Sequence, residues 1–336
     1  MKILITGGTG YIGSHVAVNL VNSGHDVVLF DNLINSHLDT FKNIKKILNR
    51  KIEFLEGDLN NPSNIKKVFD KFKIDAVFHL AGHKSVNESV LNPLEYYSNN
   101  FSGTINLLCE MKKKNIKLLV FSSSATVYGS PKYLPIDENH VTKPKNPYGR
   151  IKLQIEEMLE DIYVGDKNWR IASLRYFNPV GSHESGLIGD NPSGSINNLM
   201  PLISKVATKK SDKLIIFGND YETHDGTGVR DYIHVMDLAE GHQQSLNYLL
   251  KNKGFFKFNL GTGKGYSVLD LVKSFSQINS CKIPYVFSDR RKGDVSECYA
   301  NPKKAYEYFG WQAKRTLDDM CKSTWKFIKL NENKRV

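Results

Sequence analysis

An N-terminal strand, glycine turn and helix constrain the fold of this chain more than any other feature of its 336 residues. The short apolar run at 2–6 leads into Gly7, Gly10 and Gly13, and a helix-compatible stretch follows at 14–21. In such a turn the first glycine permits a tight bend, the second lets the backbone approach a diphosphate, and the third lets helix and strand pack closely. Because the helix N-terminus also faces the anion, this order predicts the first unit of a dinucleotide-binding domain.

A carboxylate ends the second expected strand. The run at 26–30 leads into Asp31, about 20 residues beyond the turn, where a carboxylate accepts hydrogen bonds from both hydroxyls of the adenosine ribose. A 2′-phosphate would be repelled by Asp31, and no arginine stands beside it in the sequence to compensate. The sequence therefore predicts NAD rather than NADP.

Strand and helix patterns alternate from residue 2 to about residue 177. The strand runs end in polar or small residues, and two strong helical candidates separate the later ones. This alternation predicts a doubly wound parallel Rossmann-type α/β sheet with helices on both faces. The buried strands are expected at 2–6, 26–30, 52–56, 76–80 and 116–121, and the two helices at 93–113 and 147–163.

The pattern becomes irregular beyond Pro179. Glycine, proline, serine and asparagine dominate 181–195, which predicts a long functional loop over the site. We expect an NAD-binding domain over 1–178, to which 229–261 returns, and a smaller mixed α/β substrate domain over 179–336. The expected elements of the second half are helices near 198–208, 235–250, 268–278 and 317–330, and a strand at 214–217.

Tyr148 and Lys152 are four residues apart on an expected helix, so a phenol and an ammonium share one face. A phenol has a pKa of roughly 10, and lowering it by three units requires roughly 4 kcal/mol. One ammonium does not supply all of this in water, so a second cation such as an oxidised nicotinamide ring is expected nearby. Ser124, at the carboxyl end of the run that begins at 116, can relay a proton between substrate and phenolate. Such a pair is also common on exposed helices, but Ser124 and the glycine turn favour the catalytic interpretation.

Motifs along the whole chain carry a resemblance. The turn at 7–13, the run Ser-Ser-Ser-Ala-Thr-Val-Tyr-Gly at 122–129 and the Tyr148/Lys152 pair resemble the extended short-chain dehydrogenase/reductase family. The match extends from residue 2 to about residue 330. The motifs at 175–181, 197–201, 217–221, 225–235, 259–263 and 290–294 are similar to those of the UDP-glucose 4-epimerase family.

The resemblance implies an isomerase that inverts C4 of a UDP-hexose through a 4-keto sugar, with NAD as cofactor. Tyr148 as phenolate would take the proton of the 4-hydroxyl, directly or through Ser124, and Lys152 would also bind the nicotinamide ribose. The implied NAD-binding residues are Gly7, Gly10, Tyr11, Ile12, Gly13, Asp31, Asn32, Asn35, Ser36, Asp58, Leu59, Leu80, Ala81, Gly82, Lys84, Asn99, Ser124, Tyr148, Lys152 and Phe177. The implied substrate-binding residues are Lys84, Ser124, Tyr148, Tyr176, Asn178, Asn198, Leu199, Ile215, Phe217, Arg230, Tyr232, Arg291, Asp294 and Cys298.

Some of these residues have an ordinary structural alternative. Asp58 is equally well explained as a cap or turn residue, and Lys84 as an exposed loop lysine. Arg230 and Arg291, which we place on the substrate diphosphate, could each form a surface salt bridge.

Cys298 bears on the substrate range. By resemblance it falls beside the 2-substituent of the sugar, where members restricted to unmodified hexoses carry a tyrosine. In this chain the tyrosine is Tyr299, on the opposite side of an extended backbone. A cysteine leaves room for an N-acetyl group, so we expect interconversion of UDP-N-acetylglucosamine and UDP-N-acetylgalactosamine as well as of UDP-glucose and UDP-galactose. The alternative is that Cys298 is a small buried apolar residue.

Two rival functions are compatible with parts of the sequence. A sugar-nucleotide 4,6-dehydratase on the same scaffold needs acidic groups beside the tyrosine, and relatives of that kind carry Thr-Asp-Glu where this chain has Ser124-Ala125-Thr126. A catalytically silent NAD-binding protein would not need Ser124, Tyr148 and Lys152 together. Both are therefore less favoured than the epimerase.

Composition limits the remaining possibilities. The net charge of +11 is dispersed along the chain, which argues against nucleic-acid binding and suits a substrate that carries a diphosphate. No stretch has the length of a membrane span, and a strand follows Met1 directly, so we expect a cytoplasmic protein without membrane contact. The four cysteines form no metal motif and no disulfide framework. The resemblance also implies a homodimer in which the helices at 93–113 and 147–163 pair with their copies.

Overall fold

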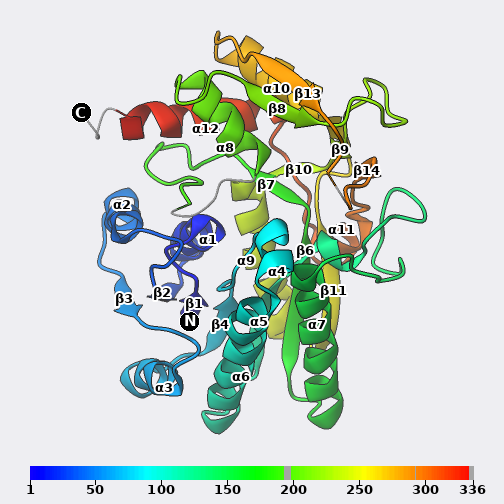
Figure 1. The fold of residues 1–336 in the computed structure, drawn as a ribbon. Coiled ribbons are helices and arrows are strands. Elements are labelled where there is room, and N and C mark those ends of the chain that lie inside the picture. The colour runs from blue at the N-terminus through cyan, green and yellow to red at the C-terminus, as the bar shows by residue number, and fades with distance from the viewer. Residues whose placement is uncertain (193–197, 292, 333–336) are drawn as a thin grey trace.

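The computed structural model describes residues 1–192, 198–291 and 293–332, and a seven-stranded sheet forms the lower half of the molecule (Figure 1). Every neighbouring pair of strands is parallel, and the order is β3-β2-β1-β4-β5-β6-β11. The order reverses between β1 and β4, where sheets of this kind bind ligands at the carboxyl ends of their strands. The strands are β1 (Lys2–Thr6), β2 (Asp26–Asp31), β3 (Glu53–Glu56), β4 (Ala76–His79), β5 (Leu118–Ser124), β6 (Arg170–Tyr176) and β11 (Gly254–Leu260).

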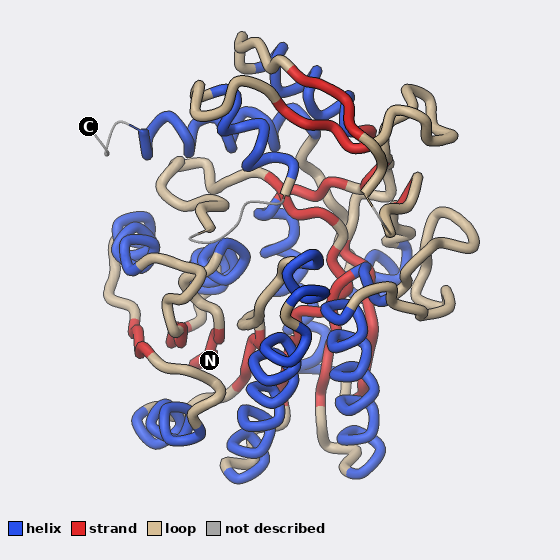
Figure 2. Tube along the Cα trace, viewed as in Figure 1, coloured by secondary structure: helices blue, strands red, loops and turns tan. Residues whose placement is uncertain are grey.

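Helices cover both faces of this sheet because side chains alternate along each strand. In β1, Ile3 and Ile5 belong to one buried cluster and Leu4 to the other. The expected doubly wound Rossmann-type architecture is thereby confirmed (Figure 2). The first face is covered by α1 (Tyr11–Asn22), α2 (Leu38–Leu48), α9 (Val235–Lys251) and α11 (Lys303–Phe309), and the second by α3 (Pro62–Lys71), α6 (Gly103–Lys113) and α7 (Pro147–Gly165).

Two expected elements differ from their prediction. The run at 52–56 was expected to be a buried strand, but β3 lies at the edge of the sheet and its side chains are only partly buried or exposed. The expected helix at 93–113 is split into α5 (Pro93–Tyr96) and α6 by the π-helical segment Tyr97–Ser102. Such wider turns are frequent at functional sites. The short helix α4 (Val86–Leu91) precedes them.

A smaller mixed unit lies above the sheet (Figure 1). Its buried cluster is formed mainly by β8 (Leu214–Phe217) and three helices, and β8 pairs in parallel with the exposed strand β13 (Tyr285–Ser288). The expected helices near 198–208, 268–278 and 317–330 and the strand at 214–217 are all present. The three helices are α8 (Leu199–Ala207), α10 (Val268–Ile278) and α12 (Leu317–Glu332).

Short strands join the two parts. β7 (Asn178–Val180) pairs with β10 (Tyr232–His234), and β9 (Val229–Arg230) lies between β12 (Tyr266–Ser267) and β14 (Glu297–Cys298). Asp231, between β9 and β10, is fully buried. Its carboxylate accepts hydrogen bonds from the backbone N–H groups of Thr262, Gly263 and Ala300. This carboxylate therefore fixes the junction above the sheet.

The loop after β7 is anchored to both parts. The Tyr11 hydroxyl donates to the Gly181 carbonyl at 2.7 Å, and Asn43 donates to the Leu187 carbonyl at 2.9 Å. Positions 193–195 of the loop expected at 181–195 lie outside the described residues. Over the described ranges, no helix is both long enough and apolar enough to span a membrane.

Candidate active site

The glycine turn joins β1 to α1 where the strand order reverses. Gly7 has a φ of +68°, and a Cβ on it would lie 2.8 Å from the backbone nitrogen of Ala81. A Cβ on Gly13 would lie 2.1 Å from the Gly7 carbonyl oxygen, so helix and strand can approach this closely only with glycine there. Gly10 caps α1 without a side chain, and the first turn holds no acidic residue. The first-turn N–H groups are thus left for an anion, and the turn fits a dinucleotide diphosphate.

Asp31 ends β2 beside this turn and is buried. Its carboxylate accepts hydrogen bonds from the N–H groups of Thr9 (3.1 Å) and Leu33 (3.0 Å) and from the Ser36 hydroxyl (3.0 Å). These bonds fix the carboxylate at the edge of the sheet where an adenosine ribose is expected. No arginine is among its described partners.

Other NAD candidates surround the same edge. Asp58 accepts hydrogen bonds from Asn32 Nδ2 (3.0 Å) and from the N–H of Asn60 (2.7 Å), so its structural role as a turn residue is present. Leu59 belongs to the core cluster of one face, whereas Ile12 and Leu80 pack against that of the other. The remaining polar candidates, Asn35 and Asn99, contact His83 and Asn100 respectively.

The π-helical segment holds the loop that carries Lys84. Asn100 Oδ1 accepts from the N–H of His83 at 2.8 Å, and Asn100 Nδ2 donates to the His83 carbonyl at 2.9 Å. Lys84 Nζ lies 5.8 Å from the ring centre of Tyr11 and 3.4 Å from the Asp190 carboxylate. The sequence predicted neither Asn100 nor Asp190, because the helical pattern at 93–113 gives no sign of a π turn and Asp190 approaches only through the fold.

Ser124, Tyr148 and Lys152 meet where β5 ends against α7. The Ser124 hydroxyl lies beside the Tyr148 phenol and favours its ionised form. Thr126 fixes Ser124 by donating to its oxygen from its own N–H (3.2 Å) and hydroxyl (2.9 Å). Lys152 Nζ donates to the Ser122 carbonyl at 2.5 Å and lies 5.8 Å from the ring centre of Tyr148. The three side chains expected to act together are therefore adjacent.

Burial within the protein works against the charged forms of both Tyr148 and Lys152. Desolvation raises the pKa of Tyr148 to about 12, opposed by the Ser124 hydroxyl. Desolvation lowers the pKa of Lys152 to about 8, opposed by the charge of Glu156. Lys152 therefore does not bring the phenol near neutrality by itself, and a second cation beside the ring is needed for Tyr148 to act as a base.

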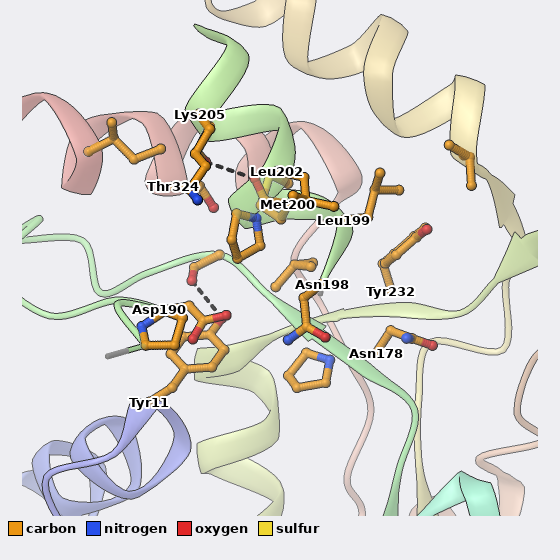
Figure 3. Close-up of a pocket in the computed structure, with 18 of the residues that line it drawn as sticks. Tyr11, Asn178, Asp190, Asn198, Leu199, Met200, Leu202, Lys205, Tyr232 and Thr324 are labelled. Carbon is orange, nitrogen blue, oxygen red and sulfur yellow. Dashed lines mark hydrogen bonds between the residues drawn. The ribbon is translucent and has the colours of Figure 1, made fainter. Parts of the chain in front are cut away.

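A pocket of about 390 Å³ lies between the sheet and the upper unit. Figure 3 shows α8 above it, Tyr11 and Asp190 on one side, and Asn178, Asn198 and Tyr232 on the other. Because Tyr11 belongs to the first turn of α1, the pocket extends to the glycine turn. The predicted substrate residues that line it are Asn178, Asn198, Leu199, Ile215, Phe217, Arg230, Tyr232, Arg291 and Asp294.

One end of this pocket combines an aromatic face with positive charge. The Arg291 guanidinium lies 4.0 Å from the ring centre of Phe217. Arg230 lies 3.9 Å from the Asp294 carboxylate and donates to the Val229 carbonyl at 2.8 Å. Both arginines are the residue type that binds a diphosphate well, and the ring offers a stacking surface for a base.

The other predicted substrate residues lie outside the pocket lining. Tyr176 is buried, and its hydroxyl hydrogen-bonds to His242 on α9, so its side chain is directed into the core. Cys298 packs with Phe177 and with the residues that follow Ser124. Burial raises the pKa of its thiol to about 11, so the thiol is neutral. Lys84, Ser124 and Tyr148 occupy the positions described above.

An acidic cluster with one histidine lies apart from this site. A group of three or more His, Cys, Asp or Glu side chains can hold a metal ion where their potential ligand atoms lie close together. In the described part of the chain, His224, Asp225 and Asp270 form such a group, with these atoms within 4.8 Å of one another. Asp225 accepts hydrogen bonds from Thr227 and Ser267. Asp270 accepts one from the backbone N–H of Ser267, the N-cap residue of α10. These bonds explain both carboxylates, and we assign the cluster no metal.

Comparison with known proteins identifies the family. A UDP-glucose 4-epimerase of Bacillus subtilis is 50% identical over 334 residues, which cover 99% of this chain and 98% of that protein. The chain belongs to the UDP-glucose 4-epimerase family. The resemblance predicted from the motifs is confirmed.

Solved structures agree with this assignment. The UDP-glucose 4-epimerase of Bifidobacterium longum, in complex with NAD⁺ and UDP, superposes with a TM-score of 0.96 at 46% identity and covers 99% of both chains. The UDP-Glc/GlcNAc 4-epimerase of Campylobacter jejuni has a TM-score of 0.85 at 34% identity and covers 98% of this chain and 99% of its own.

A broader family model, described as GDP-mannose 4,6 dehydratase, matches residues 4–324 of this chain. The chain therefore also belongs to that wider family. Dehydration is not favoured, because the chain carries Ser124-Ala125-Thr126 rather than the two acidic residues of dehydratases. In this family member Ala125 begins a short 3₁₀ turn (Ala125–Val127), and Thr126 is committed to Ser124. No carboxylate is present in the Ser124–Thr126 segment to serve elimination.

Proposed function

We propose that this protein interconverts UDP-glucose and UDP-galactose by inverting C4, with NAD as its bound cofactor. The observation that carries the proposal is the convergence of Ser124, Tyr148 and Lys152 at the end of β5, in a chain that also has the glycine turn and a pocket lined by Arg230 and Arg291. Relatives of this family act on UDP-hexoses, and the Bifidobacterium structure contains both NAD⁺ and UDP.

Tyr148 is the proposed base. Its phenolate takes the proton of the 4-hydroxyl, directly or through Ser124, and returns a proton when C4 is reduced again. When bound, NAD supplies the oxidising equivalent that converts C4 to a ketone and the reducing equivalent that restores the alcohol. Lys152 stabilises the phenolate and binds the nicotinamide ribose.

Inversion requires the keto sugar to present its other face. The nucleotide must therefore be held firmly while the sugar is held loosely. We propose that Arg230 and Arg291 bind the diphosphate, that Phe217 and Leu199 surround the uridine, and that the remaining contacts come from Asn178, Asn198 and Asp294.

The direct test is incubation of the purified protein with UDP-galactose without added cofactor. We expect UDP-glucose to appear on chromatography, approaching a constant ratio from either side, because the reaction consumes no net reductant. A sample that forms a 4-keto-6-deoxy product instead would indicate a dehydratase, and an unchanged sugar nucleotide would contradict the proposal.

Asp31 predicts the choice of cofactor. Asp31 is buried beside the glycine turn, so a 2′-phosphate on a ribose bound there would place a second anion next to it at a cost of several kcal/mol. We expect the denatured protein to release NAD or NADH, measured by chromatography of the extract. Recovery of NADP in its place would overturn the assignment.

Three further features are proposed from the same resemblance. The NAD-binding part comprises 1–178 with 229–261, and the substrate part comprises the rest of 179–336. Exposed Val90, Leu91 and Leu94 lie on α4 and α5, close to α7, and supply an apolar surface for a homodimer. A cytoplasmic location suits an enzyme whose substrate and cofactor are both soluble nucleotides.

A further inference from the structure

A third residue of α7 continues the spacing of Tyr148 and Lys152. Glu156 follows Lys152 by four residues, so all three side chains lie along one helix face. Each meets one of the last three residues of β5. The pairs are Tyr148 with the Ser124 hydroxyl, Lys152 with the Ser122 carbonyl (2.5 Å) and Glu156 with the Ser123 hydroxyl (2.5 Å).

Glu156 is a buried, fully paired carboxylate. Its side chain is 1% exposed and that of Arg175, on β6, is 2% exposed. Arg175 Nη2 donates to Oε2 at 2.6 Å and Nε donates to Oε1 at 3.0 Å, while Ser173 donates to Oε1 at 2.9 Å. Arg175 also donates to the Tyr128 hydroxyl at 3.0 Å. This arrangement pairs the carboxylate with a guanidinium and fixes its position.

The groups next to Lys152 come from β4, β5 and α7. His79, on β4, is buried, and desolvation lowers its pKa to about 3, so it is neutral. The Phe121 ring, on β5, lies 4.8 Å from Lys152 Nζ, and the Tyr148 ring, on α7, lies 5.8 Å away, with the pKa of its phenol raised by burial. Arg175, on β6, is paired with Glu156. Among the described charged side chains, Glu156 is the one whose charge raises the pKa of Lys152.

We propose that Glu156 is a positioning residue that keeps Lys152 protonated beside Tyr148 and thereby sets the alkaline limit of catalysis. The proposal rests on the roles proposed above for Tyr148 and Lys152. Arg175 contributes by its two-point pairing with the Glu156 carboxylate, and Ser123 by fixing this carboxylate against the end of β5.

The direction of the effect follows from burial. Desolvation lowers the pKa of Lys152 to about 8, and Glu156 opposes this. Loss of the carboxylate charge therefore lowers the pKa of Lys152 further, so the ammonium loses its proton at a lower pH. Activity that depends on this ammonium then declines nearer to neutrality.

The test compares pH profiles of kcat for UDP-galactose in the purified holoenzyme. In Glu156→Gln we expect the alkaline limb to move to lower pH by about half a unit or more, with KM changed by less than about threefold because no substrate contact is removed. Glu156→Asp keeps the charge and should move the limb back toward the wild-type position. A profile that superposes on the wild type after scaling, with a lower melting temperature alone, would show a structural role and overturn the proposal.

Glu160→Gln is the matched control, because Glu160 lies one turn further along α7, where it is 51% exposed and pairs with Lys257. Its profile should superpose on that of the wild type. Should Glu156→Gln not fold, Glu156→Gln/Arg175→Met removes both buried charges, which cores tolerate better than one unpaired charge. The same acidward shift is expected there, and its absence would equally overturn the proposal. A wild-type protein without any turnover would instead contradict the proposed function.

Discussion

Tyr148→Phe is expected to keep NAD and UDP binding and to lose kcat by roughly 10² to 10⁴-fold. The substitution removes one oxygen without changing the shape of the ring, so the pocket and the glycine turn remain intact. The phenol is the group that lies beside Ser124 and Lys152, and phenylalanine can neither take nor return a proton. Steady-state kinetics with UDP-galactose, together with calorimetric binding of UDP, measure the two properties separately.

Two further variants serve as comparisons for Tyr148→Phe. Tyr163→Phe changes another tyrosine of α7, far along the helix from Ser124, and should keep wild-type turnover. Lys152→Met should lose turnover and also weaken NAD binding, because it removes both the charge and the expected ribose contact. Wild-type-like turnover in Tyr148→Phe would exclude the phenolate mechanism.

Cys298→Tyr is expected to abolish conversion of UDP-N-acetylglucosamine and to leave UDP-galactose turnover largely intact. Cys298 packs beside Ala125 and Phe177, immediately behind the serine turn that presents Ser124. A phenol at this position would fill the space that an N-acetyl group needs. We therefore propose that the wild-type protein accepts both the acetylated and the plain hexoses, as the name of the Campylobacter relative states for that enzyme.

The comparison is made with both substrate pairs under identical conditions. Cys298→Ser preserves the small volume and should retain activity on all four sugar nucleotides. If the wild-type protein converts UDP-galactose but not UDP-N-acetylglucosamine, the predicted substrate range is wrong. If Cys298→Tyr still converts the acetylated pair, Cys298 is merely a packing residue.

The parts of the fold that rest on local pattern were predictable from the sequence. Glycine spacing and apolar runs define β1, α1 and β2, because a bend and a buried strand each impose a requirement on adjacent residues. The exposure of β3 was not predictable in this way, since the edge of a sheet is decided by strand order rather than by the composition of the strand. The π-helical segment was missed for a related reason, because its residues fit a continuous helical pattern equally well.

The candidate site shows the same division. The adjacency of Tyr148 and Lys152 could be predicted from helical spacing alone. The position of Ser124 near the ligand site could be predicted because it ends a strand. Asp190 pairs with Lys84 across more than a hundred residues of sequence, and Arg175 on β6 pairs with Glu156 on α7. Such pairs depend on topology, which a single sequence does not display. The position of Glu156 beside Lys152 could nevertheless have been predicted, because Glu156 continues the four-residue spacing of Tyr148 and Lys152.

Tyr11 lies at both of the regions proposed to bind the cofactor and the substrate. It opens the helix that faces the expected cofactor diphosphate, and its ring forms a wall of the substrate pocket while its hydroxyl holds Gly181. A side chain shared in this way makes the two occupancies energetically dependent on each other. Thermodynamic linkage then requires the two effects to be equal: if bound UDP changes the affinity for NAD by some factor, bound NAD changes the affinity for UDP by the same factor. If UDP binding tightens NAD binding through Tyr11, the nucleotide of the substrate helps the protein to retain NAD from one turnover to the next.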